Sequence, residues 1–250
     1  MTFTSHTTEP FMTEPLFYAE HLPDTGATFT LTGDEAHHAA ASRRLAPGDT
    51  LWLFDGRGSL ARATLGQITK RGHELALRIE ERHTEPPSKP SIHLACALPK
   101  GDRQSVLLDM ATQLGMTRFT PLVCERGVVK PGAHSPERWQ RICLEACKQS
   151  RRVYLPEIHE PATPAQIVAS HRGAWIAHPS GVAAGAMLAG TAPETLTLLV
   201  GPEGGFTEEE VRQAVEQDAR AVSLGSAILR IETAAISLLA VISLAARNAG

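Results

Sequence analysis

The stretch Leu198–Thr207, LLVGPEGGFT, decides the fold of the second half of this 250-residue chain. An apolar run typical of a strand ends directly in a glycine-rich turn, and Thr207 then caps a helix that begins with Glu208–Glu210. Backbone amides therefore lie at the C-terminal edge of a strand, where they either bind a ligand or form a tight structural turn. The turn is not a P-loop, because no Lys-Ser or Lys-Thr pair follows the glycines.

A second glycine turn, Leu224–Arg230 (LGSAILR), follows the next predicted strand, and one helix separates the two turns. In a right-handed βαβ unit both turns emerge at the same edge of the sheet, so they are expected to face one crevice. Glu203 and Arg230 are the charged residues of these turns, and they form either a structural ion pair or functional groups. Glu232 is expected to interact with the dipole of the last helix.

Strands and helices alternate through the chain after residue 90, which predicts a parallel sheet covered by helices. The predicted strands are Ser91–Ala97, Thr117–Val123, Ala174–Ala177, Thr195–Val200 and Ala221–Leu224. The predicted helices are Asp102–Leu114, Ser135–Gln149, one opening at Thr163, one opening at Glu208 and an apolar last helix through Arg247.

The segment His83–Pro90, HTEPPSKP, holds three prolines and predicts an extended connector between two domains. Before it, short strands are predicted at Thr50–Phe54, Ser59–Leu65 and His73–Ile79, which indicates a small β-rich domain. DGRGSLA (Asp55–Ala61) contains a GxGxxA string, but a strand-like segment follows it, so it predicts a hairpin turn. We divide the chain into a mobile tail at 1–14, a β-barrel domain at 15–85 and an α/β domain at 86–250.

The composition is that of a globular protein, with 42% hydrophobic and 20% charged residues. The longest apolar stretch, Ala234–Ala246, is interrupted by Ser237 and Ser243 and is too short to span a bilayer. The N-terminal residues resemble no secretory signal, so a cytoplasmic protein without membrane association is expected.

Four cysteines, Cys96, Cys124, Cys143 and Cys147, form no CxxC pair, and the eleven histidines form no HExxH motif. Buried reduced thiols and no metal site are therefore expected.

The net charge of −3 argues against nucleic-acid binding by bulk electrostatics. The charge is unevenly distributed, however: residues 1–85 carry −4, residues 86–160 carry +4 and residues 161–250 carry −3. A local basic surface in the middle third remains compatible with RNA binding.

The pair of motifs GPEGGFTEEEV (Gly201–Val211) and LGSAILRIETAA (Leu224–Ala235) resembles the C-terminal signature of the RsmE-type 16S ribosomal RNA uracil-N3 methyltransferases. This family belongs to the knotted SPOUT superfamily. The resemblance covers nearly the whole chain and includes the segments Leu98–Arg126, Arg138–Ser150, Leu155–Ile158 and Arg43–Gly58.

The resemblance implies an α/β fold, with a trefoil-knot, parallel-sheet SPOUT methyltransferase domain after a small PUA-like β-barrel that binds RNA. It also implies S-adenosylmethionine as cofactor, held by residues of the knot loops. These are Ala177, His178, Pro179, Val200, Gly201, Pro202, Gly204, Gly205, Phe206, Leu224, Gly225, Ser226, Ile228 and Leu229.

In the implied reaction, Arg230 stabilises negative charge on the uracil carbonyls, and Glu203 accepts the N3 proton or braces its loop. The implied partners are 16S ribosomal RNA within the 30S subunit and a second copy of the chain, with the last helix as a candidate interface. Six basic residues are either phosphate contacts or solvated charges: Arg43, Arg44, Lys100, Arg126, Arg151 and Arg152.

The chain departs from the family pattern at Leu16, Lys148, Ser226 and Ile231, none of which is a turn glycine or Arg230. Two alternatives stay open: another SPOUT enzyme that methylates a ribose 2′-oxygen, and a ribosome-assembly factor that binds RNA without catalysis.

Overall fold

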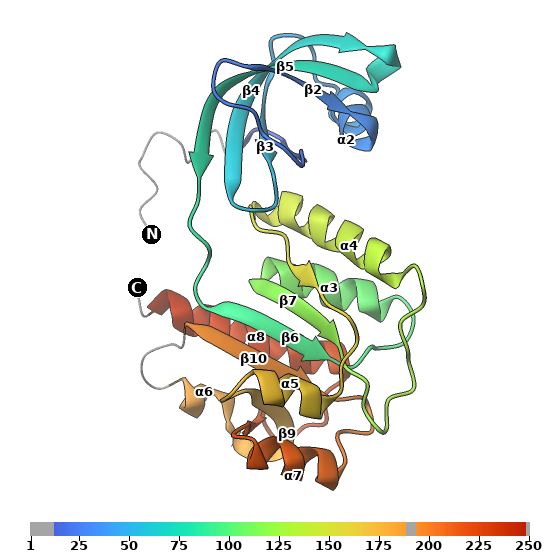
Figure 1. The fold of residues 1–250 in the computed structure, drawn as a ribbon, viewed down its shortest axis with the longest axis vertical. Helices are drawn as coiled ribbons and strands as arrows, with labels where there is room; N and C mark the ends of the chain where they lie inside the picture. Colours follow the sequence, from blue (N-terminus) through green and yellow to red (C-terminus); the bar gives the residue numbers. More distant parts are fainter. Residues whose placement is uncertain (1–12, 189–193, 249–250) are drawn as a thin grey trace. The chain divides into compact units, whose positions relative to one another are not determined.

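A computed structural model of the chain describes residues 13–188 and 194–248, and most of the predicted N-terminal tail lies outside this part. The chain divides into two compact units. The first consists of the chain up to Pro87 together with Cys147–Leu155, and the second consists of Ser88–Ala146 and Pro156–Gly250. Figure 1 shows their elements along the chain.

The first unit contains one five-stranded sheet with the order β1-β3-β4-β5-β2. Its strands are β1 (Leu16–Tyr18), β2 (Thr28–Thr32), β3 (Thr50–Phe54), β4 (Ser59–Thr69) and β5 (Glu74–Thr84). The short helix α2 (Gly33–His37), the π-helical turn η1 (His38–Ser42) and the 3-10 turn η2 (Lys70–Gly72) complete it. The pair β1–β3 is parallel and the other pairs are antiparallel.

The turn between β3 and β4 is a hairpin, as predicted for DGRGSLA. The Asp55 carboxylate accepts hydrogen bonds from the backbone amides of Arg57 at 2.8 Å and Ser59 at 3.0 Å. Glu14 accepts hydrogen bonds from Thr50 at 2.6 Å and from Arg62 at 2.8 Å, so the end of the predicted tail is anchored to the sheet.

The second unit contains a six-stranded sheet with the order β11-β9-β10-β6-β7-β8, and every pairing is parallel, as predicted. Its strands are β6 (Ser91–Cys96), β7 (Met116–Pro121), β8 (Glu157–Ile158), β9 (Trp175–Ala183), β10 (Thr195–Val200) and β11 (Arg220–Ser223). Its helices are α3 (Arg103–Gln113), α4 (Ser135–Ser150, whose last turn belongs to the first unit), α5 (Pro164–Ser170), α6 (Ala184–Met187), α7 (Glu208–Glu216) and α8 (Ile231–Asn248).

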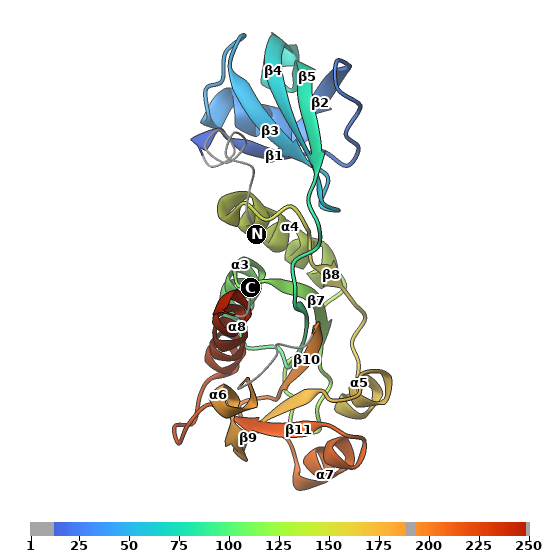
Figure 2. The same cartoon turned by 90° about the vertical axis from the view of Figure 1, so that its left-hand side faces the viewer.

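Helices cover both faces of this sheet. Figure 2 shows α3 and α8 on one side of the strands and α5 and α7 on the other. The central strands are accordingly apolar on both faces: Leu198 and Leu199 of β10 and Leu94 of β6 are fully buried. On α4, the ring of Trp139 packs edge-on against Phe119 of β7, with ring centroids 5.6 Å apart.

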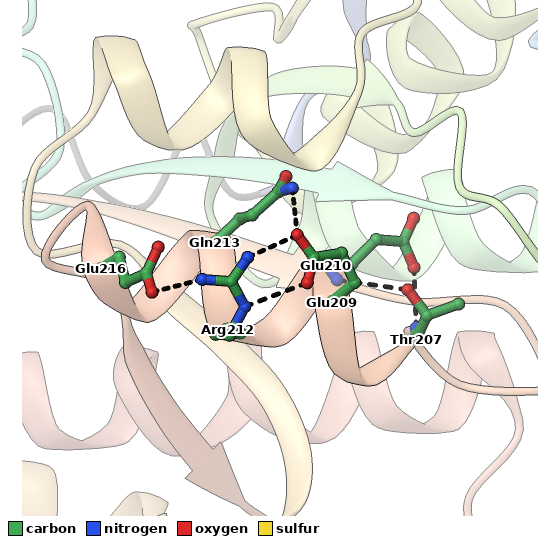
Figure 3. A network of polar contacts seen from close by, with 6 residues as sticks. All are labelled: Thr207, Glu209, Glu210, Arg212, Gln213 and Glu216. Carbon is green, nitrogen blue, oxygen red and sulfur yellow. Dashed lines mark hydrogen bonds and ion pairs between the residues drawn. The ribbon is translucent and has the colours of Figure 1, made fainter.

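The start of α7 is fixed directly behind the first glycine turn. Thr207 Oγ1 accepts a hydrogen bond from the Glu210 amide at 3.1 Å, and the Glu210 carboxylate accepts one from the Thr207 amide at 2.8 Å. Arg212 pairs with both Glu209 and Glu216 along the exposed side of the helix (Figure 3). The predicted cap at Thr207 is confirmed.

The four cysteines are buried and none is joined in a disulfide, and no group of three or more metal-ligating side chains gathers in the described residues. Burial raises the pKa of Cys124 to about 12 and that of Cys143 to about 11. Among the helices that the structure describes, none has the length and hydropathy needed to cross a membrane.

Candidate active site

Three adjacent strands of the second unit, β11, β9 and β10, end at one edge of the sheet because they run parallel. The turns that follow β10 and β11, together with residues 177–179 and the start of α8, enclose a cavity of about 270 Å³. Residues 177–179 were expected in a loop after a strand ending at Ala177, but β9 continues to Ala183 and contains them. Both glycine turns contribute to the cavity's wall, which agrees with the expectation that they face one crevice. Its lining residues are Ala177, His178, Pro179, Val200, Gly201, Pro202, Glu203, Gly204, Gly205, Phe206, Val222, Ser223, Leu224, Gly225, Ala227, Ile228, Leu229, Ile231 and Ala234.

The structure brings together nearly all of the residues that the sequence assigned to the cofactor. Ser226 is exposed and is the one member of that set outside the lining, whereas its neighbour Ala227 lies inside it. Ile231 and Ala234 were missed, and both belong to the first turn of α8. Their three-residue spacing places them on one helix face, and this spacing was the signal that could have found them.

The backbone of both turns requires glycine. Gly205 has a φ of +69° and Gly225 a φ of +123°, values that side-chain-bearing residues rarely adopt. Gly201 is needed for another reason, since a Cβ there would meet the ring of Phe206 at 3.0 Å.

Two arginines from elsewhere in the second unit brace the first glycine turn, Arg126 from the loop after β7 and Arg103 from the start of α3. Arg126 Nη1 donates a hydrogen bond to the carbonyl oxygen of Gly204 at 2.9 Å and approaches that of Phe206 at 3.4 Å. Arg103 Nη2 lies 3.4 Å from Glu203 Oε1. The side chain of Arg126, predicted as an RNA contact, thus has an intramolecular role in the turn.

Glu203 and Arg230 do not form the ion pair that the sequence left open. Glu203 pairs with Arg103 instead, whereas Arg230 is exposed and forms no ion pair among the described residues. The carbonyl oxygen of Arg230 accepts a hydrogen bond from the Ala234 amide at 2.9 Å, so its backbone begins α8. Arg230 is not among the lining residues, but its neighbours Leu229 and Ile231 are, so its backbone lies at the cavity's margin.

Glu232, which was expected to interact with the dipole of the last helix, also pairs with an arginine. It is only 8% exposed, and its Oε1 lies 3.5 Å from Arg103 Nη1. Sequence reasoning missed Arg103, because ion pairs over such long sequence separations leave no local pattern.

Of the other predicted RNA contacts, Lys100 is exposed in the second unit, and four arginines belong to the first unit. Arg43 and Arg44 are exposed, and Arg151 and Arg152 are partly buried. Burial and the nearby charge of Arg43 lower the pKa of Arg151, while burial lowers that of Arg152. The structure therefore brings Arg43 and Arg151 within electrostatic reach of each other.

Comparison with known proteins identifies the family. Residues 86–243 match the family model of an RNA methyltransferase domain, and residues 31–76 match that of an RNA methyltransferase PUA domain. The chain is 35% identical over 235 residues to the ribosomal RNA small subunit methyltransferase E of Mycobacterium bovis, covering 90% of this chain and 89% of the relative. The chain belongs to the ribosomal RNA small subunit methyltransferase E family.

A further relative and two solved structures are similar to this chain over most of its length. The ribosomal RNA small subunit methyltransferase E of Synechocystis is 36% identical, with 87% of this chain and 73% of the relative covered. The solved methyltransferase E of Neisseria gonorrhoeae, bound to S-adenosyl methionine, superposes with a TM-score of 0.81 at 30% identity, covering 91% of this chain and 95% of that chain. A putative methyltransferase from Legionella pneumophila, in complex with bound SAM, gives a TM-score of 0.83 at 30% identity. The match covers 93% of this chain and 98% of that chain.

The predicted family is confirmed by these matches. The predicted fold class, a parallel-sheet α/β methyltransferase domain preceded by a PUA-like β domain, is confirmed as well.

Proposed function

We propose that this chain transfers the methyl group of S-adenosylmethionine to N3 of a uridine in 16S ribosomal RNA. The observation that carries the proposal is the cavity between the two glycine turns, which the family signature itself builds. Two similar solved structures are complexes with this cofactor, which supports the choice of donor.

The lining of the cavity fits such a donor. Phe206, Leu229 and Ile231 provide apolar surface for an adenine ring and the carbons next to sulfur. Because glycine has no side chain, the glycine turns allow the main chain to approach the polar edges of the ligand closely. When bound, the cofactor supplies an electrophilic methyl group on a sulfonium centre.

The residues of the chain must make uracil N3 a nucleophile. N3 carries a proton in the neutral base, and losing that proton leaves negative charge on the ring and its two carbonyl oxygens. Arg230 is a permanent cation at the margin of the cavity, and it would stabilise this charge while the N3–methyl bond forms and the methyl–sulfur bond of the donor breaks, which leaves S-adenosylhomocysteine. The N3 proton passes to solvent water. We assign Glu203 the bracing role, because its carboxylate is paired with Arg103.

The target base must be unpaired or flipped out, since N3 lies on the Watson–Crick edge. We assign the phosphate contacts to the exposed or partly buried cations of the basic middle section and the first unit, namely Arg43, Arg44, Lys100, Arg151 and Arg152. We rank Arg126 below these five residues as a phosphate contact, because its guanidinium already binds a carbonyl oxygen of the glycine turn. An acidic chain with a local basic region should prefer a 30S subunit to free RNA.

The proposed assembly is a homodimer in the cytoplasm that uses the last helix as interface. Leu244 of α8 is 63% exposed, and Val106 and Met110 on the adjoining helix α3 are also exposed. Exposed apolar side chains on neighbouring helices are typical of an interface. Light scattering after size-exclusion chromatography tests this assembly, with twice the 26.9 kDa chain mass as the expected value.

Donor binding and turnover of Arg230→Ala test the proposed reaction. We expect donor affinity, measured by calorimetry, to stay near that of the wild type, and turnover on 30S subunits to fall about 100-fold or more. Arg220→Ala, at an exposed arginine of β11, is the matched control and should keep normal turnover. Wild-type turnover in Arg230→Ala removes Arg230 from the mechanism, and a wild-type chain without donor affinity leaves only a non-catalytic RNA-binding role.

A further inference from the structure

Arg103 links three segments of the second unit. It is the first residue of α3, which follows β6, and its guanidinium contacts carboxylates from the turn after β10 and from the first turn of α8. Nη2 lies 3.4 Å from Glu203 Oε1, and Nη1 lies 3.5 Å from Glu232 Oε1. One cation therefore connects the glycine turn that lines the cavity with the first turn of α8.

The position of Arg103 is itself fixed by its neighbours. Gln104, the next residue, is buried, and its Nε2 donates a hydrogen bond to the carbonyl oxygen of Pro99 at 3.0 Å. Its Oε1 accepts a hydrogen bond from Arg138 Nη2 of α4 at 2.8 Å. The start of α3 is thus tied to the loop before it and to a second helix.

Glu232 depends on Arg103 for its charge balance. Its side chain is nearly buried, and its Oε2 has no hydrogen-bond partner among the described residues. A buried carboxylate is costly without a compensating cation, and Arg103 is the cation that the structure places beside it. The nearby thiol of Cys96 supplies no proton or charge, because burial, with smaller effects from Cys124 and Glu232, raises its pKa well above the ordinary value.

The location of Glu232 sets the location of Arg230. Only Ile231 separates the two residues, and the Arg230 carbonyl already accepts the first hydrogen bond of α8 from Ala234 at 2.9 Å. A helical turn is rigid, so a shift of Glu232 moves the backbone from which the Arg230 side chain extends.

We propose that Arg103 is a positioning residue, which holds the Glu203 turn and the start of α8 together and thereby holds Arg230 at the margin of the cavity. This inference rests on the proposed function, in which Arg230 stabilises the reacting base. Arg103 contacts the first glycine turn only through the side chain of Glu203, whereas Arg126 holds the backbone of that turn through the carbonyl oxygens of Gly204 and Phe206. The two arginines should therefore affect different kinetic constants.

The test compares Arg103→Ala, Arg103→Lys and Arg126→Ala, each with thermal melting and the stoichiometry of donor binding as checks of folding. In Arg103→Ala we expect kcat on 30S subunits to fall about 10- to 100-fold while the donor Kd changes less than about threefold. Arg103→Lys should recover part of kcat, because an ammonium still compensates Glu232. In Arg126→Ala the donor Kd should rise with kcat less affected.

A double variant tests whether Arg103 acts through Glu232. Arg103→Ala combined with Glu232→Gln removes the uncompensated buried charge, so its kcat should exceed that of Arg103→Ala alone. A kcat in Arg103→Ala equal to that of the wild type, or a double variant no better than the single one, overturns the inference. Failure of the proposed function looks different, since the wild-type chain itself would then transfer no methyl group to the RNA.

Discussion

The stability of the second unit should fall in acid because of one buried histidine. His93 of β6 is only 6% exposed and shares a 2.8 Å hydrogen bond with Thr120 Oγ1. The rings of His171 and His159 lie 4.9 and 5.9 Å away, centroid to centroid. Burial, with smaller electrostatic effects from His171, His159 and Arg118, lowers the pKa of His93 to about 4 from 6.5.

The direction of this pH effect on stability follows from proton binding. The unfolded chain binds a proton at His93 below pH 6.5, whereas the folded chain binds it only near pH 4, so acid favours unfolding. The stabilisation is present above pH 6.5 and is lost as the pH falls. These values correspond to a loss of about 2 kcal/mol between pH 7 and pH 5, and about 3 kcal/mol by pH 4.

Urea unfolding followed by tryptophan fluorescence, at several pH values between 7.5 and 4, measures this loss. His93→Gln keeps a hydrogen-bonding group for Thr120 and removes the titration, so its unfolding free energy should depend less on pH by about 2 kcal/mol at pH 5. His134→Gln, at an exposed histidine of the same unit, is the control and should keep the wild-type dependence. Equal pH dependence in His93→Gln and the wild type would refute the reasoning.

Three further predictions concern the glycine turns and the core. Thr207→Ala removes the cap of α7 and should lower the free energy of unfolding by about 1 kcal/mol, measured by chemical denaturation. Gly225→Ala imposes a side chain at a φ of +123° on the cavity wall and should weaken donor binding in calorimetry, whereas Gly26→Ala, at a φ of +85° in the first unit, should not. Cys124 and Cys143, whose thiols have pKa values raised to about 12 and about 11, should react with a thiol reagent at pH 8 only after unfolding.

Local patterns in the sequence predicted the sheet of the second unit well. Apolar runs bounded by glycine or proline marked β6 and β10, and Thr207 marked the start of α7 to the residue. The order of the strands was not predictable in this way, because β9 and β10 pair with strands far away in the sequence. The three-residue strand β1 was also missed, since its partner β3 lies more than 30 residues later.

Separation along the sequence also explains which residues of the candidate site could be predicted. The cavity wall consists of two continuous turns, so sequence reasoning found most of its residues. Arg103 acts on Glu203 and Glu232, which follow it by 100 residues or more, and its role became visible only in the fold. The segment Cys147–Leu155 likewise joins the first unit through contacts such as the Gly58 amide with the Val153 carbonyl at 3.1 Å.

The most direct test of the central claim locates the transferred methyl group. Naked 16S ribosomal RNA, 30S subunits and 70S ribosomes are each incubated with the chain and isotopically labelled S-adenosylmethionine, and the digested nucleosides are identified by mass spectrometry. We predict labelled N3-methyluridine at a single position of 16S ribosomal RNA, formed fastest on 30S subunits. Label on a ribose 2′-oxygen, on another base or on another RNA would contradict the proposed function.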